Sequence, residues 1–105
     1  MAQVIWTEPA LQDLNEIAEF IALDKVSAAN KLVLKVFTAT ERLEKSPKSG
    51  RKPPELENSR YLELIVNPCR IFYRLEKDKV YILYVMRSER MLRNYLLDDR
   101  ANESS

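Results

Sequence analysis

Two adjacent segments in the second half of the chain constrain the fold most. Residues 69–75 and 79–90 are rich in β-branched and aromatic residues, and a short polar turn separates them. This pattern predicts the two strands of a hairpin. Both segments also carry arginines, and the second ends in a cluster that contains Arg87 and Arg90. The hairpin therefore supplies apolar residues for a core and guanidinium groups that can bind a phosphate or a carboxylate.

The first half of the chain predicts a short strand and two helices. Residues 4–6 form a β-type run, and Thr7, two positions before a proline, is typical of a helix start. Apolar residues recur at helical spacing over 9–23 and again over 27–45, where Ser27 is the expected N-cap. The link between the helices is short, which favours an antiparallel αα-hairpin.

A loop and three more strands complete the pattern. Residues 46–59 contain three prolines and the single glycine, which predicts an irregular loop. Period-2 strands follow over 60–66, 69–76 and 79–87, joined by tight turns. The order β-α-α-β-β-β predicts an α+β fold, with a four-stranded, antiparallel-rich sheet and the αα-hairpin packed on one face.

Size and composition limit the chemistry that this chain can perform. A chain of 105 residues predicts a single domain, expected over residues 1–97, with a polar, frayed tail over 98–105. The absence of histidine removes the usual general base and metal ligand, and one glycine excludes glycine-rich phosphate loops. A single cysteine, no long apolar run and no signal-peptide pattern predict a cytoplasmic protein. No cofactor and no metal site are predicted.

Charge is distributed unevenly, although the net charge is only +1. The first 41 residues hold three Lys/Arg and six acids, whereas the rest of the chain holds 14 Lys/Arg and 10 acids. Five basic residues and one acid fall within residues 42–52. Such a cluster attracts phosphate or an acidic protein partner, and a solvated loop is the alternative. The candidate binding residues in this cluster are Lys48, Arg51 and Lys52.

Five short signatures follow one another along nearly the whole chain. They are Trp6-Thr7-Glu8-Pro9-Ala10-Leu11, Gly50-Arg51-Lys52-Pro53-Pro54-Glu55-Leu56, Tyr61-Leu62-Glu63-Leu64, Cys69-Arg70-Ile71-Phe72-Tyr73 and Met86-Arg87-Ser88-Glu89-Arg90. In order and spacing, and together with the predicted elements, they resemble the ParE branch of the RelE/ParE toxin superfamily over residues 3–97.

The resemblance implies the growth-arresting toxin of a type II toxin–antitoxin module, neutralised by a small antitoxin. Antitoxins of this superfamily wrap an extended segment over the toxin, and the acidic first helix and the basic loop offer it surfaces of opposite sign. The target stays open, because ParE-like members poison DNA gyrase whereas RelE-like members cut mRNA on the ribosome. A small metal-independent endonuclease, acting on DNA or RNA, is the alternative. A non-toxic relative kept as an interaction module is a third reading.

If the chain is a nuclease, the resemblance suggests five residues for the phosphate. Arg70 matches a strand arginine of ribosome-dependent members, and its planar fork fits two phosphate oxygens. Arg87 and Arg90 would neutralise charge in the transition state. Glu55 would act as a general base, and Tyr95 would stack on a base or donate a proton.

Each of these residues also has a structural interpretation. The alternatives are an ion pair of Arg70 with Glu63 or Glu76, ion pairs of Arg87 and Arg90 with Glu55, Glu89 or an antitoxin carboxylate, a solvated or loop-capping Glu55, and an apolar stripe of Tyr95 with Leu92 and Leu96.

Two departures from the nuclease pattern favour the ParE-like interpretation. Leu62, Glu63 and Leu64 stand on the strand where RelE-like members carry paired lysines. The histidine-tyrosine ending of another subgroup is absent as well. The sequence therefore favours interference with DNA gyrase over cleavage of mRNA on the ribosome.

Overall fold

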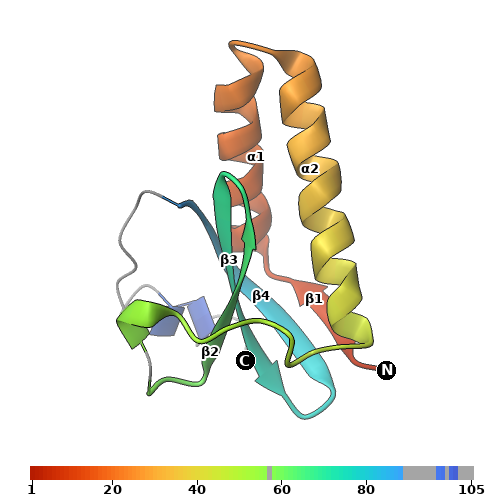
Figure 1. Ribbon diagram of the computed structural model, residues 1–105, viewed down its shortest axis with the longest axis vertical. Helices are drawn as coiled ribbons and strands as arrows, with labels where there is room; N and C mark the ends of the chain where they lie inside the picture. The colour runs from red at the N-terminus through yellow and green to blue at the C-terminus, as the bar shows by residue number, and fades with distance from the viewer. Residues whose placement is uncertain (57, 89–96, 99, 102–105) are drawn as a thin grey trace.

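Two helices lie side by side against one face of a sheet in the computed structural model, which describes residues 1–56, 58–88, 97, 98, 100 and 101 (Figure 1). The principal elements are β1 (Gln3–Trp6), α1 (Glu8–Ala22), α2 (Val26–Glu41), β2 (Tyr61–Val66), β3 (Cys69–Glu76) and β4 (Lys79–Arg87). Two short 3-10 turns, η1 (Arg42–Glu44) and η2 (Pro54–Leu56), lie between α2 and β2. The predicted α+β fold and the order of its elements are confirmed.

The sheet has four strands in the order β1-β4-β3-β2. The β2–β3 and β3–β4 pairs are antiparallel, whereas β1 runs parallel to β4, with Gln3 opposite Lys79 and Trp6 opposite Ile82. The predicted antiparallel-rich sheet is therefore confirmed, and β1 and β2 are its two edges. An irregularity between Phe72 and Tyr73 shifts the register against β4 and leaves Leu83 as the extra residue.

The helix ends differ in part from prediction. Thr7 caps α1 as expected: its hydroxyl accepts a hydrogen bond from the Ala10 amide at 3.4 Å and donates one to the Ile82 carbonyl at 2.7 Å. The expected cap at Ser27 is wrong, because α2 already begins at Val26, with Lys25 as N-cap and no side-chain hydrogen bond. The second helix is also shorter than predicted, since α2 gives way to η1 at residue 42.

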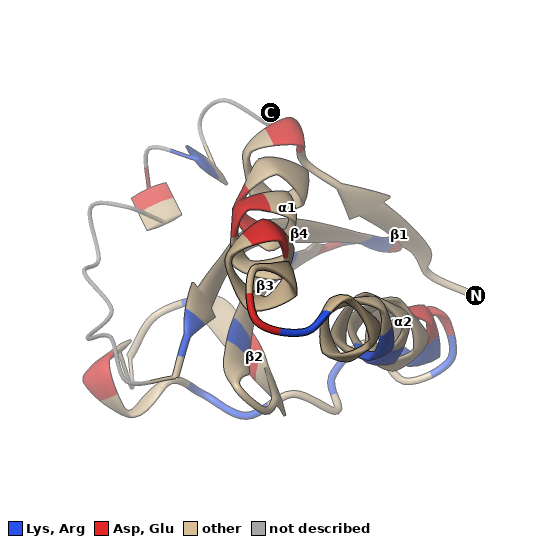
Figure 2. Ribbon diagram, turned by 90° about the horizontal axis from the view of Figure 1, so that it is seen from above, with Lys and Arg blue, Asp and Glu red and all other residues tan. Residues whose placement is uncertain are grey.

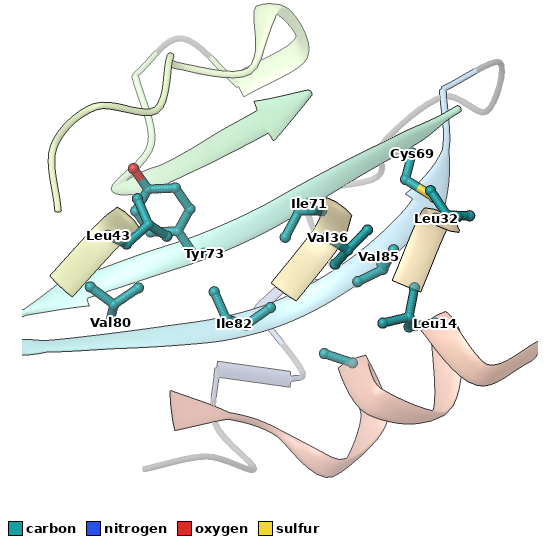
Figure 3. Packing of buried hydrophobic residues seen from close by; sticks show 11 residues of the cluster. Leu14, Leu32, Val36, Leu43, Cys69, Ile71, Tyr73, Val80, Ile82 and Val85 are labelled. Atoms are coloured by element: carbon teal, nitrogen blue, oxygen red, sulfur yellow. The ribbon is translucent and has the colours of Figure 1, made fainter. Parts of the chain in front are cut away.

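The main core lies between the helices and the sheet. Figure 3 shows Leu14, Leu32 and Val36 of the helices facing Ile71, Ile82 and Val85 of the sheet. These six side chains are almost completely removed from water. Burial of apolar surface on this scale is what holds an αα-hairpin on a sheet, because the short helices have little stability alone.

A second core covers the opposite face of the sheet. In β3 the six residues from Cys69 to Arg74 are all buried, so neither face of this strand is solvated. The prediction placed the αα-hairpin on one face of the sheet and did not include this burial of the opposite face. The second core consists of Tyr61, Phe72, Leu83, Met86, Leu97 and Ala101.

The end of the chain takes part in this second core. Leu97 and Ala101 are fully buried, Asp98 accepts a hydrogen bond from the Tyr61 hydroxyl at 2.6 Å, and Arg100 forms an ion pair with Asp13 of α1. The expected frayed tail is thus wrong for residues 98, 100 and 101. The polar composition of this segment did not indicate that Ala101 is buried, or that Asp98 and Arg100 have partners inside the domain.

Candidate functional site

Arg70 forms the centre of a charged network on the second face of the sheet. Its Nη1 and Nη2 donate to the two carboxylate oxygens of Glu55, at 2.8 and 2.7 Å. Its Nε donates to Glu63 Oε2 at 2.9 Å, and its guanidinium carbon lies 5.0 Å from the centre of the Phe72 ring. The predicted ion pair of Arg70 with Glu63 is confirmed, whereas Glu76 pairs with Arg74 instead, at 3.2 Å.

Glu63 joins this network to the loop between α2 and β2. The second oxygen of Glu63 accepts a hydrogen bond from Arg51 Nε at 2.8 Å, and its side chain is completely buried. The backbones of Arg51 and Glu63 also exchange two hydrogen bonds, of 3.0 and 2.8 Å, as an isolated β-bridge. The acid at this position, which departs from the paired lysines of RelE-like members, therefore binds two arginines at once.

The same loop is fixed at Gly50 by a buried tyrosine. The Tyr73 hydroxyl accepts a hydrogen bond from the Gly50 amide at 2.9 Å and donates one to the Pro47 carbonyl at 2.9 Å. A Cβ atom on Gly50 would lie only 2.5 Å from this hydroxyl and 2.8 Å from the Glu63 carbonyl oxygen. Glycine is therefore required here by the close approach of the loop to the sheet.

The electrostatics of the network favour a permanently charged, structurally engaged Arg70. The hydrogen bonds that Arg70 donates to Glu55, with a smaller contribution from Glu63, raise the pKa of the Arg70 guanidinium, and burial opposes them. The four charges of Arg51, Arg70, Glu55 and Glu63 sum to zero. Glu55 is thus neither simply solvated nor a loop cap in this structure, since both of its oxygens contact Arg70.

The remaining basic candidates lie on the exposed outer side of the loop. Lys48, Arg51 and Lys52 are all exposed, and Lys52 Nζ donates to the Ser59 carbonyl at 3.3 Å. Figure 2 shows acidic residues on α1 and basic residues along α2 and the loop that follows it. The opposite signs expected for the first helix and this loop are therefore present on the surface.

Arg87 lies apart from Arg70. Successive strand residues face opposite sides of a sheet, and Arg87 is paired in register with Cys69, which belongs to the helix-side core. Its guanidinium carbon lies 5.3 Å from the centre of the Phe20 ring on α1. The structure thus places these two arginines on different faces of the sheet, and their joint role at one phosphate stays a prediction that this placement does not support. Arg90 and Tyr95 lie outside the described residues.

Two contacts of the chain end were not found from the sequence. Asp13 Oδ2 accepts a hydrogen bond from the Val85 amide at 3.1 Å and also binds Arg100, whose Nη1 donates to the Leu83 carbonyl at 3.1 Å. These groups flank the irregular part of β4, where ladder hydrogen bonds are interrupted. Asp13 and Arg100 are 87 positions apart, and no local pattern signals such a pair.

Within residues 1–56, 58–88, 97, 98, 100 and 101 there is no group of three or more Cys, Asp or Glu side chains that could hold a metal ion. None of the helices within the same residues has the length and apolar character needed to cross a membrane.

Comparison with known proteins identifies the family. Residues 4–92 match the family described as "ParE toxin of type II toxin-antitoxin system, parDE". The chain is 39% identical over 84 residues to Y4kP from Sinorhizobium fredii, covering 80% of this chain and 85% of that protein. It is 33% identical over 92 residues to Toxin RelE2 from Caulobacter vibrioides, covering 87% of this chain and all of that protein.

The fold also has a solved counterpart. A chain in a structure titled "Chromosomal ParDE TA system from P. aeruginosa" superposes with a TM-score of 0.70 at 24% identity, covering 85% of this chain and 98% of that one. This likeness concerns the fold, while the family match and the relatives concern the sequence. The protein described here belongs to the ParE toxin family of type II toxin–antitoxin systems.

Proposed function

We propose that this toxin arrests growth in the cytoplasm as a protein-binding poison of DNA gyrase, and that a cognate antitoxin neutralises it. The observation that carries the proposal is the engagement of Arg70. Arg70, the residue best suited to bind a phosphate, is held by Glu55 and Glu63, and these three side chains together with Arg51 carry no net charge. While both acids bind it, this guanidinium is not available to the dianionic transition state of phosphodiester cleavage.

The alternative, a metal-independent endonuclease acting on DNA or RNA, has less support. Both oxygens of Glu55, the candidate base, are occupied by Arg70, and Arg87 faces the other side of the sheet. What favours the alternative is the exposed basic loop, which can attract a phosphate backbone through Lys48, Arg51 and Lys52.

A surface suited to an extended antitoxin segment lies along β2, at the edge of the sheet. Because the Glu63 backbone faces outward to Arg51, the backbone groups of Ile65, two residues further, face outward as well. A groove of about 400 Å³ runs beside them, and the side chains of Ile65 and Leu34 are 45% and 69% exposed. An open strand edge with apolar neighbours fits addition of a strand by a partner.

The target is tested by incubating the toxin with supercoiled or relaxed plasmid. Each plasmid is tested in the presence and in the absence of purified gyrase and ATP, and no other nuclease is added. We expect the toxin to leave the plasmid intact when gyrase is absent and to produce broken plasmid, released by detergent and protease, when gyrase is present. Nicking without gyrase that disappears in Arg70→Ala would refute the proposal and establish the endonuclease. Intact plasmid in every lane would exclude both actions on DNA.

The antitoxin surface is tested with Ile65→Lys, because a lysine on an edge strand opposes strand addition. The matched control is Leu23→Lys, which changes an 86% exposed leucine after the end of α1. We expect the affinity for the cognate antitoxin to fall in the first variant only. The affinity of the unchanged toxin is also expected to fall as salt is added, if the basic cluster of residues 42–52 contacts acidic residues. Equal affinities for both variants would place the antitoxin elsewhere.

A further inference from the structure

The contact between Glu55 and Arg70 has the geometry of a receptor and its ligand. Two parallel hydrogen bonds of 2.7 and 2.8 Å join the terminal nitrogens of the arginine to the two oxygens of one carboxylate. Arginine forks bind the carboxylates and phosphates of other molecules in this way. Here the bound carboxylate comes from the same chain.

The two acids that hold Arg70 are attached very differently. Glu63 is on a strand, is completely buried and is bound by Arg51 as well as Arg70. Glu55 is on η2, a turn of three residues within the loop, and its side chain is 24% exposed. Glu55 is therefore the acid that can leave Arg70 without disrupting the sheet, whereas Glu63 is a fixed part of the fold.

The surroundings determine what can take the place of Glu55. When Glu55 leaves, Arg51, Arg70 and Glu63 together carry one positive charge, which one carboxylate neutralises. The recess that borders Glu55, of about 510 Å³, is also lined by Leu56 and Tyr61 and by two residues of opposite charge, Asp98 and Arg60. The opposite charges of Asp98 and Arg60 offset each other, so one carboxylate balances the charge that Glu55 leaves behind, whereas the successive phosphates of a nucleic acid would bring more negative charge than these described residues balance.

We propose that Arg70 is a binding site for the carboxylate of an acidic peptide segment in a protein partner, and that Glu55 occupies it until the partner arrives. The inference extends the proposed function, in which the partners are proteins. Glu55 acts as an internal competitor that keeps Arg70 paired in the free toxin. The partner binds only while Glu55 is away from Arg70, so its apparent affinity is the intrinsic affinity multiplied by that fraction of time.

The test uses the full chain and two synthetic probes in calorimetric titrations. The first probe is a capped peptide with one glutamate among glycine and serine residues, and its control has glutamine in place of that glutamate. The second is a single-stranded hexamer of thymidine nucleotides. The variants are Glu55→Gln, which weakens the internal competitor, and Glu41→Gln, which removes the same charge from an exposed position at the end of α2.

We expect Glu55→Gln to bind the glutamate peptide about ten-fold or more tightly than the unchanged toxin, because one charge-assisted contact is worth at least that factor. Glu41→Gln and the glutamine peptide are expected to show no gain. In labelled Glu55→Gln the Arg70 Nε–Hε resonance should shift on addition of the peptide, which reports the site even if an Arg70 variant fails to fold.

Three results would overturn the inference. Equal affinity of Glu55→Gln and the unchanged toxin would show that Glu55 does not compete for the site. An equal gain in peptide affinity in Glu41→Gln would show that the gain comes from the change in net charge and not from the loss of Glu55. A larger gain for the thymidine hexamer than for the peptide would make Arg70 a phosphate site. None of these results depends on gyrase, so the plasmid experiment can fail or succeed independently.

Discussion

The hydroxyl of Tyr73 binds the loop at two points, accepting from the amide of Gly50 and donating to the carbonyl of Pro47, both at 2.9 Å. Tyr73 is itself fully buried in the main core. The loop that carries Arg51 and Glu55 is therefore positioned from inside the protein, although most of its charged residues face solvent.

Removing this hydroxyl is expected to weaken the fold. Tyr73→Phe leaves the Gly50 amide and the Pro47 carbonyl without this partner, which should lower the free energy of unfolding by about 1–3 kcal/mol. Urea denaturation followed by circular dichroism measures the loss. Tyr81→Phe is the matched control, since the Tyr81 hydroxyl makes no hydrogen bond within the described residues. Equal losses in both variants would contradict the anchoring role.

The buried tyrosines predict a loss of stability in alkali. Burial raises the pKa of Tyr73 above 10.0, against the opposing hydrogen bond from Gly50, and burial together with the bond to Asp98 raises that of Tyr61. Above pH 10 the unfolded chain loses these protons while the folded protein keeps them, so stability is complete below pH 10 and falls as the pH rises toward the folded pKa values. Urea midpoints at pH 9 and 10.5 should fall less in Tyr73→Phe than in the unchanged protein. An identical decline would show that Tyr73 does not contribute.

The pair formed by Asp13 and Arg100 is expected to fix the end of the chain. Their side chains are only 17% and 22% exposed, and both contact the irregular part of β4. Asp13→Asn should cost about 1–3 kcal/mol of unfolding free energy, whereas Glu16→Gln, an exposed neutralisation one turn later, should cost little. A double-mutant cycle with Arg100→Gln isolates the coupling. Additive losses would indicate two independent contributions.

Truncation of the chain end should unfold the protein as well as silence it. A deletion of residues 91–105 removes Leu97 and Ala101 from the second core and exposes Phe72 and Met86 to water. Such a variant is expected to lose toxicity, and antitoxin binding with it, since both depend on the folded sheet. Circular dichroism of the purified truncated chain checks this directly. A folded truncated chain that still binds antitoxin would instead locate the toxic action in the removed segment.

The turn between β3 and β4 is expected to accept glycine. Lys77 has a φ of 57°, the one non-glycine residue with positive φ in the described ranges. Because that conformation costs a non-glycine residue about 1–2 kcal/mol, and glycine adds entropy to the unfolded chain, Lys77→Gly should be neutral or stabilising by up to about 1 kcal/mol. Asp78→Gly, one position later, should destabilise, as measured by thermal denaturation. If Lys77→Gly destabilised the protein more than Asp78→Gly, the backbone of Lys77 would not be strained.

The sequence predicts those elements whose apolar residues repeat at helical or strand spacing within a short segment. Helical spacing located α1, and β-branched runs located β2, β3 and β4, because each pattern reports the faces of a single element. The pairing of β1 with β4 and the second core join residues far apart in the chain, so no short window contains them. The sequence predicts separate roles for Glu55, as a base, and for Glu63, as a structural partner, and only the folded loop shows that both bind Arg70.

The second core contains residues that are made at different times during synthesis. Phe72 and Met86 are translated before Leu97 and Ala101, the residues that cover them. The helices precede β3 and β4, which they cover, whereas Leu97 and Ala101 follow those strands in the chain. One face of the sheet can therefore be covered as soon as its strands have been made, while the opposite face waits for residues that are made later.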